Sequence, residues 1–320
     1  MTRLRVVYLG TPEFAVPSLQ ALLDETDVLA VITQPDRPKG RGRQVASPPV
    51  AEVAEANGVP VLQPARLRSP EVIETLRELA PDVNVTVAYG RIIPREVLEL
   101  PRLGSINVHP SLLPKYRGAS PITSAILNGE TETGVTIMYQ SMELDAGDLI
   151  LQRRVPIAPE DTARTLYDRL ARLGADALVE ALRLVAAGRA PRIPQDHAAA
   201  TYAGKLEKEH GRIDWAKPAR ELVNLIRAMD PWPSAYTMHR GRLLKVWRAS
   251  VRDEAGAGEP GTVLDVGPGE GIVVASGQGA VRLLEVQPEG RRRMSADEYA
   301  RGARLRPGER LVEGADPRML

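Results

Sequence analysis

Continuous apolar runs that alternate with amphipathic helical segments are the feature that most constrains the fold of this chain. Residues 4–10 (LRVVYLG) and 28–34 (VLAVITQ) have the pattern of strands buried on both faces. Residues 69–80 (SPEVIETLRELA) carry apolar side chains at helical spacing, and residues 105–110 (SINVHP) form a later apolar run. Strands of this kind separated by helices are typical of a mostly parallel sheet. The sequence therefore predicts a Rossmann-like, doubly wound α/β domain.

The pattern changes in the second half of the 320-residue chain. Residues 190–207 are rich in proline, alanine and polar side chains without periodicity, which is typical of a linker. One helical segment, residues 218–229, and a series of short apolar segments separated by glycine turns follow it. Such short strands with one helix predict a small β-barrel of the oligonucleotide/oligosaccharide-binding (OB) type. The expected domains are residues 1–189 and residues 208–320.

The composition excludes several classes of protein. The chain has no cysteine, which excludes disulfides, thiolate nucleophiles and cysteine-ligated metals and fits a reducing cytoplasm. No apolar run approaches the roughly 20 residues of a membrane-spanning helix, and the N-terminus lacks the pattern of a secretory signal. No His-Glu-x-x-His pattern supports a metal site. We expect a soluble, cytoplasmic protein without a metal.

One short loop carries a concentration of positive charge although the net charge of the chain is only +1. Between Asp36 and Glu52 all charged side chains are basic. They are Arg37, Lys39, Arg41 and Arg43. A local basic loop on a nearly neutral protein suits a polyanionic partner that is contacted at a few phosphates. The alternative is an ordinary solvated loop.

An asparagine and a histidine at the end of one predicted strand are the clearest candidates for chemistry. Asn107 and His109 are two residues apart, so a strand projects both from the same face, and Pro110 ends that strand. Open α/β sheets bind their ligands at the carboxyl ends of strands. An amide that stabilises an oxyanion beside an imidazole that handles a proton is the minimal set for acyl transfer. On this spacing alone, the more frequent case is an asparagine that caps a loop and a histidine that is hydrogen-bonded to the backbone.

The acidic turn LDAGD offers a carboxylate that could orient the histidine. It follows a predicted strand and contains Asp145 and Asp148 on either side of Gly147. A carboxylate near an imidazole raises its basicity and fixes its orientation. The alternative is a solvated turn. No G-x-G-x-x-G follows the first strand, where GTPEF stands instead, which argues against a nicotinamide oxidoreductase.

A series of motifs resembles a known enzyme family. GTPEFA, TQPDRPKGRGR, VAYGRIIP, INVHPSLLPKYRGASPI, TGVTIM, LDAGD and QPEGRRRMS are similar, in this order, to motifs of the 10-formyltetrahydrofolate-dependent formyltransferases. The resemblance runs from about residue 4 to about residue 312. The small departures, such as GASPIT and Pro110, do not affect the candidate catalytic positions.

The resemblance implies a function for each of these positions. Asn107, His109 and Asp145 match the catalytic residues, although the sequence does not decide whether His109 or Asp145 is the general base. The tetrahydrofolate site would include two segments, Ser111, Leu112, Leu113 and Pro114 together with Tyr89, Gly90, Arg91 and Ile92.

The resemblance also implies the acceptor of the formyl group. The group would pass from 10-formyltetrahydrofolate to the α-amino group of initiator methionyl-tRNA, whose acceptor arm the basic loop with Arg41 would contact. The expected protein is a monomer. The alternatives are a formyltransferase for an amino-sugar nucleotide, which the basic loop disfavours, and a non-catalytic RNA-binding protein, which the complete catalytic set disfavours.

Overall fold

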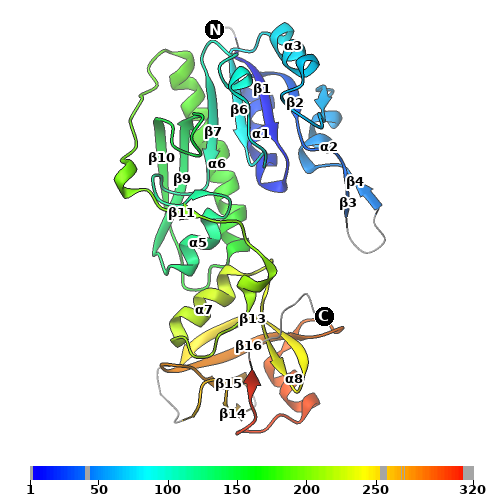
Figure 1. The fold of residues 1–320 in the computed structure, drawn as a ribbon, viewed down its shortest axis with the longest axis vertical. Coiled ribbons are helices and arrows are strands. Elements are labelled where there is room, and N and C mark those ends of the chain that lie inside the picture. The colour runs from blue at the N-terminus through cyan, green and yellow to red at the C-terminus, as the bar shows by residue number, and fades with distance from the viewer. Residues whose placement is uncertain (1–2, 40–43, 253–257, 268, 270, 313–320) are drawn as a thin grey trace. The chain divides into compact units, whose positions relative to one another are not determined.

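The protein consists of two compact units in the computed structural model, which describes residues 3–39, 44–252, 258–267, 269 and 271–312 (Figure 1). The first unit comprises Met1–Pro121, Glu132–Pro156 and Tyr167–Ala203. The second comprises Ile122–Thr131, Ile157–Leu166 and Gly204–Leu320.

The first unit is built on a seven-stranded sheet with the order β10-β9-β7-β6-β1-β2-β5. The strands are β1 (Arg5–Gly10), β2 (Asp27–Ile32), β5 (Val61–Leu62), β6 (Val83–Val87), β7 (Ser105–His109), β9 (Glu132–Tyr139) and β10 (Leu149–Pro156). Strands β5, β2, β1, β6 and β7 pair in parallel, whereas β9 is antiparallel to both of its neighbours. The predicted Rossmann-like, mostly parallel sheet is confirmed.

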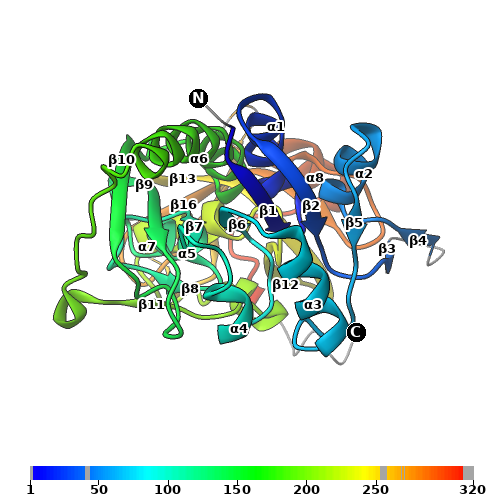
Figure 2. The same ribbon diagram turned by 90° about the horizontal axis from the view of Figure 1, so that it is seen from above.

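Helices cover both faces of this sheet, as Figure 2 shows. They are α1 (Val16–Glu25), α2 (Pro49–Ala56), α3 (Pro70–Leu79), α4 (Arg95–Leu98) and α6 (Ala163–Ala186), of which residues 163–166 belong to the second unit. Helices α1 and α6 lie on one face, and α3 and α4 lie on the other. Two small two-stranded sheets, β3 (Arg37–Lys39) with β4 (Gln44–Ala46) and β8 (Arg117–Gly118) with β11 (Tyr202–Ala203), complete the unit.

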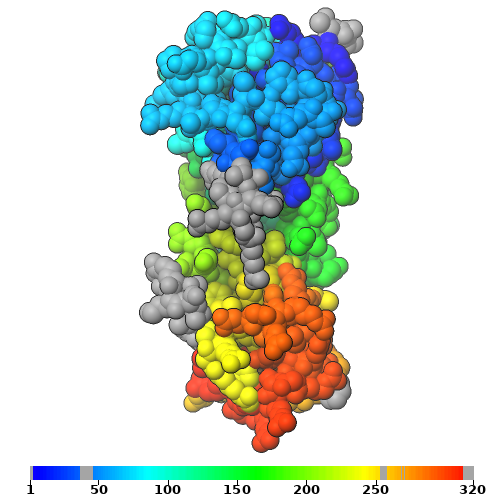
Figure 3. All heavy atoms as spheres, turned by 90° about the vertical axis from the view of Figure 1, so that its right-hand side faces the viewer, coloured from blue at the N-terminus to red at the C-terminus, as the bar shows by residue number. Residues whose placement is uncertain are grey.

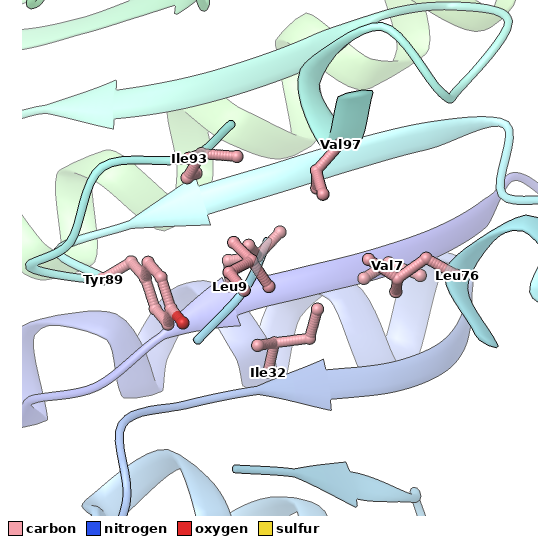
Figure 4. Close-up of a cluster of buried hydrophobic side chains, with 8 residues drawn as sticks. Val7, Leu9, Ile32, Leu76, Tyr89, Ile93 and Val97 are labelled. Atoms are coloured by element: carbon pink, nitrogen blue, oxygen red, sulfur yellow. The ribbon is translucent and has the colours of Figure 1, made fainter. Parts of the chain in front are cut away.

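The core beneath α3 and α4 follows from the alternation of side chains along β1. Val7 and Leu9 face Leu76 of α3 and Val97 of α4, with Ile32 of β2 beside them (Figure 4). These side chains are almost completely buried. Burial of each such side chain contributes about 1.5–3 kcal/mol, so this layer fixes how the sheet and its helices are stacked.

The same alternation orients β7, and this decides where its polar side chains point. Val108 faces α6, since a Cβ atom placed on Gly174 of that helix would lie 2.9 Å from Val108 Cγ1. Neighbouring residues of a strand point to opposite faces. Asn107 and His109 therefore project together from the face opposite α6, as the sequence predicts.

The second unit contains an antiparallel sheet with the order β14-β15-β16-β13-β12-β18 and β17 paired to β16. Its strands are β12 (Ala235–His239), β13 (Arg242–Arg252), β14 (Val263–Gly267), β15 (Gly271–Ala275), β16 (Ala280–Pro288), β17 (Met294–Ser295) and β18 (Leu311–Val312). Its helices are α5 (Pro121–Leu127), of which Pro121 belongs to the first unit, α7 (Ala219–Ala228) and α8 (Ala296–Ala303). Figure 3 shows the segment that includes α8, coloured orange, at the surface of this unit.

The two edges of this curled sheet meet. The amide of Leu311 donates to the Gly261 carbonyl and the amide of Val263 donates to the Glu309 carbonyl, each at 2.8 Å. Thr262 and Arg310 form a further antiparallel bridge. Because the edge strands satisfy each other, the sheet closes into a barrel. The predicted small OB-like barrel is confirmed.

The segment predicted as a linker has ordered contacts with the first unit through residue 203. Ile193 exchanges main-chain hydrogen bonds with Leu149 at 2.8 and 3.1 Å, and β11 pairs with β8. The bounds of the catalytic domain, linker and barrel remain predictions. Among the helices that the structure describes, none combines the length and the apolar character required to cross a bilayer.

Candidate active site

His109 is the last residue of β7 and its ring is held from two sides. The side chain is only 4% exposed. Its Nε2 atom lies 2.9 Å from the carbonyl oxygen of Tyr116. Because a carbonyl can only accept, Nε2 carries a proton and Nδ1 is the nitrogen that faces the site. Nδ1 lies 3.7 Å from Oδ2 of Asp145. This distance is too long for a direct hydrogen bond, so Nδ1 can still exchange a proton with another group.

Asp145 reaches the histidine because the turn after β9 folds back on the strand. Its carboxylate Oδ2 accepts a hydrogen bond from the main-chain amide of Gly118 at 2.8 Å. The side chain is 12% exposed. The backbone of Asp145 has a φ of 50°, in the left-handed region that non-glycine residues seldom adopt. Such strain persists only where neighbouring contacts enforce it, and it is concentrated at functional sites.

Gly147 is required by the close approach of this turn to β9. A Cβ atom at this position would lie 1.8 Å from the carbonyl oxygen of Tyr139. No side chain fits at that distance. The glycine in LDAGD is therefore what lets Asp145 come back over the strand.

Asn107 lies on the same face of β7 as His109 and is largely buried. Its main chain pairs with Thr86 of β6 and Met138 of β9, so the strand is held on both sides. Within the described parts of the chain, no group forms a hydrogen bond with its side-chain amide. The amide N–H groups can thus be directed to a bound substrate.

In the predicted folate segment after β7, two residues are buried and two are more accessible. Ser111 and Leu113 are buried. The Ser111 carbonyl accepts a hydrogen bond from Thr136 Oγ1 and the Leu113 carbonyl accepts one from Gln152 Nε2. These two residues shape the loop that presents the Tyr116 carbonyl to His109. Leu112 and Pro114 are half-buried and remain able to touch a ligand.

The second predicted folate segment shows the same division. Tyr89 is buried at the edge of the core in Figure 4, its hydroxyl has no partner among the described residues, and burial raises its pKa. Gly90 has a φ of 78°, and a Cβ there would lie 2.7 Å from Gln34 Nε2. Arg91 donates to the carbonyls of Pro64 and Ala65. Ile92, in contrast, is 89% exposed.

A hollow of about 530 Å³ lies at the opposite, amino end of β7. Ser105, Tyr139, Gln140 and Met142 contribute to its wall, and the Arg192 guanidinium lies 3.7 Å from the centroid of the Tyr139 ring. Asn107, His109 and Asp145 do not line it. Within the described residues, no cluster of three or more His, Asp or Glu side chains could hold a metal ion.

The basic loop is described only in its flanks. Arg37 and Lys39 belong to β3, which pairs in an antiparallel manner with β4. Arg41 and Arg43 lie outside the described residues. The proposed contacts of all four side chains therefore remain predictions.

Three residues that complete the site are not apparent from the sequence pattern. The Tyr116 carbonyl and the Gly118 amide act through the main chain, which leaves no side-chain signal. Gln195, in the predicted linker, donates to the carbonyls of Asp145 and Gly147. Its position in an aperiodic segment gave no sign of this contact.

Comparison with known proteins identifies the family to which this chain belongs. Residues 3–182 match the family described as Formyl transferase, and residues 205–304 match Formyl transferase, C-terminal domain. The chain belongs to the formyl transferase family. The resemblance of its motifs to the 10-formyltetrahydrofolate-dependent formyltransferases is confirmed.

More specific relatives identify the branch of this family. The methionyl-tRNA formyltransferase of Symbiobacterium thermophilum is 53% identical over 312 residues, which cover 96% of this chain and 95% of that protein. The enzyme of the same name from Geobacter metallireducens is 48% identical over 312 residues, which cover 97% and 99%. By this similarity the chain belongs with the methionyl-tRNA formyltransferases.

Solved structures with lower identity share the fold. The N-formyltransferase from Helicobacter canadensis, solved with folinic acid and dTDP-3-aminofucose, is 22% identical and superposes with a TM-score of 0.65. The match covers 88% of this chain and 99% of that chain. At this level of identity the similarity establishes the architecture alone.

The close approach at Gly147 leads to a testable prediction. In Gly147→Ala the new methyl group displaces the turn from Tyr139, so Asp145 moves away from His109. We expect the turnover number for formyl transfer to fall by about 100-fold, because misplacement of a catalytic group by about 1 Å has effects of this size. Steady-state kinetics measures the turnover number, and thermal melting shows whether the variant is folded. Gly204→Ala is the control, since a Cβ there meets nothing within 4 Å. A Gly147→Ala enzyme with full activity would contradict this interpretation of the turn.

Proposed function

We propose that this protein transfers the formyl group of 10-formyltetrahydrofolate to the α-amino group of methionine on initiator tRNA. The observation that carries the proposal is the convergence of Asn107, His109 and Asp145 at the carboxyl end of β7. The chain that carries them is about half identical to methionyl-tRNA formyltransferases over almost its full length.

Each of the three side chains has a distinct part in the proposed reaction. The neutral amine attacks the formyl carbon, and the carbonyl oxygen becomes an oxyanion in the tetrahedral intermediate. The Asn107 amide donates to this oxyanion, and a proton on His109 Nδ1 provides a second donor. The intermediate then breaks its bond to N10 of the folate, which leaves as tetrahydrofolate with a proton.

Asp145 acts on the histidine. The hydrogen bond between Nε2 and the Tyr116 carbonyl sets the orientation of the ring, and in this orientation the Asp145 carboxylate faces Nδ1. The carboxylate also compensates the positive charge that the ring acquires when it takes up a proton. The proton released by the amine passes to the Asp145–His109 pair.

The folate co-substrate would lie along the segments 89–92 and 111–114, as the family resemblance implies. Their exposure in this chain favours a division of roles. Ile92, Leu112 and Pro114 are accessible and would contact the ligand, whereas Ser111 and Leu113 shape the loop. The strand that leads to Asp145 would form another wall of the site.

The tRNA would be bound by the basic loop and by the barrel. Arg37, Lys39, Arg41 and Arg43 would contact phosphates near the end of the acceptor arm, and the barrel over residues 208–320 would add contacts along it. Phosphate contacts of this kind position the substrate without reading its sequence. The protein would act as a monomer in the cytoplasm, where charged initiator tRNA is found.

A formylation assay tests the proposed function. The purified protein, 10-formyltetrahydrofolate and methionyl initiator tRNA are expected to give N-formylmethionyl-tRNA, with no transfer to a dTDP-amino sugar assayed in parallel. Asn107→Ala and His109→Ala should each lower the turnover number by about 100- to 1,000-fold, as expected for loss of an oxyanion donor. Asn57→Ala, at an exposed asparagine outside the proposed site, is the matched control and should be unaffected. Transfer to the amino sugar but not to the tRNA would refute the proposal.

The salt dependence of tRNA binding tests the role of the basic loop separately. Arg41→Ala should weaken tRNA binding and reduce the slope of log affinity against log salt by about one, because one phosphate contact is lost. Fluorescence titration from low to physiological salt measures the slope. Arg77→Ala, at an exposed arginine of α3 that pairs with Glu74, serves as the control. An unchanged slope in Arg41→Ala would exclude this loop from phosphate contact.

A further inference from the structure

Gln195 is a buried polar side chain that the proposed chemistry does not use. Its side chain is 5% exposed. It lies two residues after Ile193, whose main chain forms hydrogen bonds with that of Leu149. A buried amide is costly unless its donors and acceptors are satisfied, so its partners indicate what it is held against.

Every hydrogen-bonding position of the Gln195 amide is occupied. Nε2 donates to the carbonyl oxygen of Asp145 at 2.9 Å and to that of Gly147 at 2.8 Å. Oε1 accepts from Arg117 Nη2 at 2.9 Å and from Arg117 Nε at 3.2 Å. An amide rotated by 180° would turn its N–H groups to the guanidinium and its oxygen to two carbonyls. The orientation of Gln195 is therefore fixed.

Arg117 anchors this amide because its own charge is buried. The side chain is 1% exposed, and a buried guanidinium requires hydrogen-bond partners. Besides Gln195 it has Glu143 Oε1 at 3.3 Å and His197 Nδ1 at 3.4 Å. Glu143 belongs to the same turn as Asp145. The guanidinium thus holds the turn at two places, directly through Glu143 and indirectly through Gln195.

The turn needs such support at Asp145. A left-handed backbone is unfavourable for a residue with a side chain, and the φ of Asp145 is 50°. The two Gln195 hydrogen bonds are made to the carbonyl of this residue and to the carbonyl two residues later. They stabilise the conformation in which the carboxylate faces His109.

We propose that Gln195 is a positioning residue for formyl transfer: it holds the main chain of Asp145 so that the carboxylate faces Nδ1 of His109. Arg117 fixes the Gln195 amide and so takes part in the same arrangement. The kinetic part of this inference depends on the proposed function, because it is measured as formylation of methionyl-tRNA.

The variant Gln195→Glu distinguishes the contact of the amide oxygen with Arg117 from the contacts of the amide nitrogen with the Asp145 and Gly147 carbonyls. The variant has nearly the same shape and keeps an oxygen for Arg117, but it places a carboxylate oxygen against the Asp145 and Gly147 carbonyls. We expect the turnover number to fall by about 10- to 100-fold, with the KM for folate and the melting temperature nearly unchanged. Gln20→Glu makes the same exchange at an exposed position of α1 and should leave all three values unchanged.

A role restricted to the fold gives the opposite result. If Gln195 served only as a partner for the buried Arg117, a glutamate would be a better partner, and Gln195→Glu would be as active as the wild type and at least as stable. That outcome would overturn the proposal.

A double-mutant cycle with Asp145→Asn tests whether Gln195 acts through Asp145. In the Asp145→Asn background, Gln195→Glu should cost less than about twofold, because residues that act as one unit are not additive. Full additivity would show that Gln195 acts independently of Asp145.

A crystal structure of Gln195→Glu gives a readout that does not depend on activity. The Asp145 carboxylate is expected to lie about 1 Å or more from its position beside His109. An undisplaced carboxylate would overturn the positioning role. A wild-type protein that does not formylate methionyl-tRNA would overturn the proposed function and leave this structural test in force.

Discussion

The two-sided hold on the His109 ring is the interaction on which the rest of the site depends. The Tyr116 carbonyl binds Nε2 and the Asp145 carboxylate faces Nδ1. A histidine free to rotate would spend much of its time with the wrong nitrogen toward the substrate. Because Nε2 is bound to the Tyr116 carbonyl, this nitrogen is committed to the structure, and Nδ1 is the nitrogen that we propose takes part in proton transfer.

Both partners of the ring come from irregular segments that rigid elements hold in place. The loop after β7 is fixed by Thr136 and Gln152 through the carbonyls of Ser111 and Leu113. The turn after β9 is fixed by its close contact at Gly147. Strained turns on a well-packed sheet are a common way to hold reactive groups, because the core supplies the stability that the turns lack.

The regular part of this arrangement could be predicted from sequence, and the irregular part could not. Periodicity alone was enough to place Asn107 and His109 on one face of a strand, because strand geometry fixes which side chains share a face. The pairing with Asp145 came from family resemblance. The contact of Gln195 depends on how an aperiodic segment returns to the sheet, and local propensity carries no information about it.

The folate segments show a second limit of sequence reasoning. Motif resemblance assigned the whole run from Ser111 to Pro114 to ligand contact. The structure buries Ser111 and Leu113 against the body of the unit and leaves Leu112 and Pro114 more accessible. A motif can therefore combine buried residues that shape a loop with accessible residues that are free to contact a ligand, and burial distinguishes the two groups.

The position of the proton on the His109 ring most directly tests whether Tyr116 and Asp145 orient this histidine as described. The chain has four histidines, so ¹⁵N-labelled protein gives few ring signals, and a His109→Gln variant assigns the relevant pair. We expect the neutral ring to carry its proton on Nε2, toward Tyr116, with Nδ1 unprotonated and facing Asp145. A neutral ring protonated on Nδ1, with a bare Nε2, would contradict it.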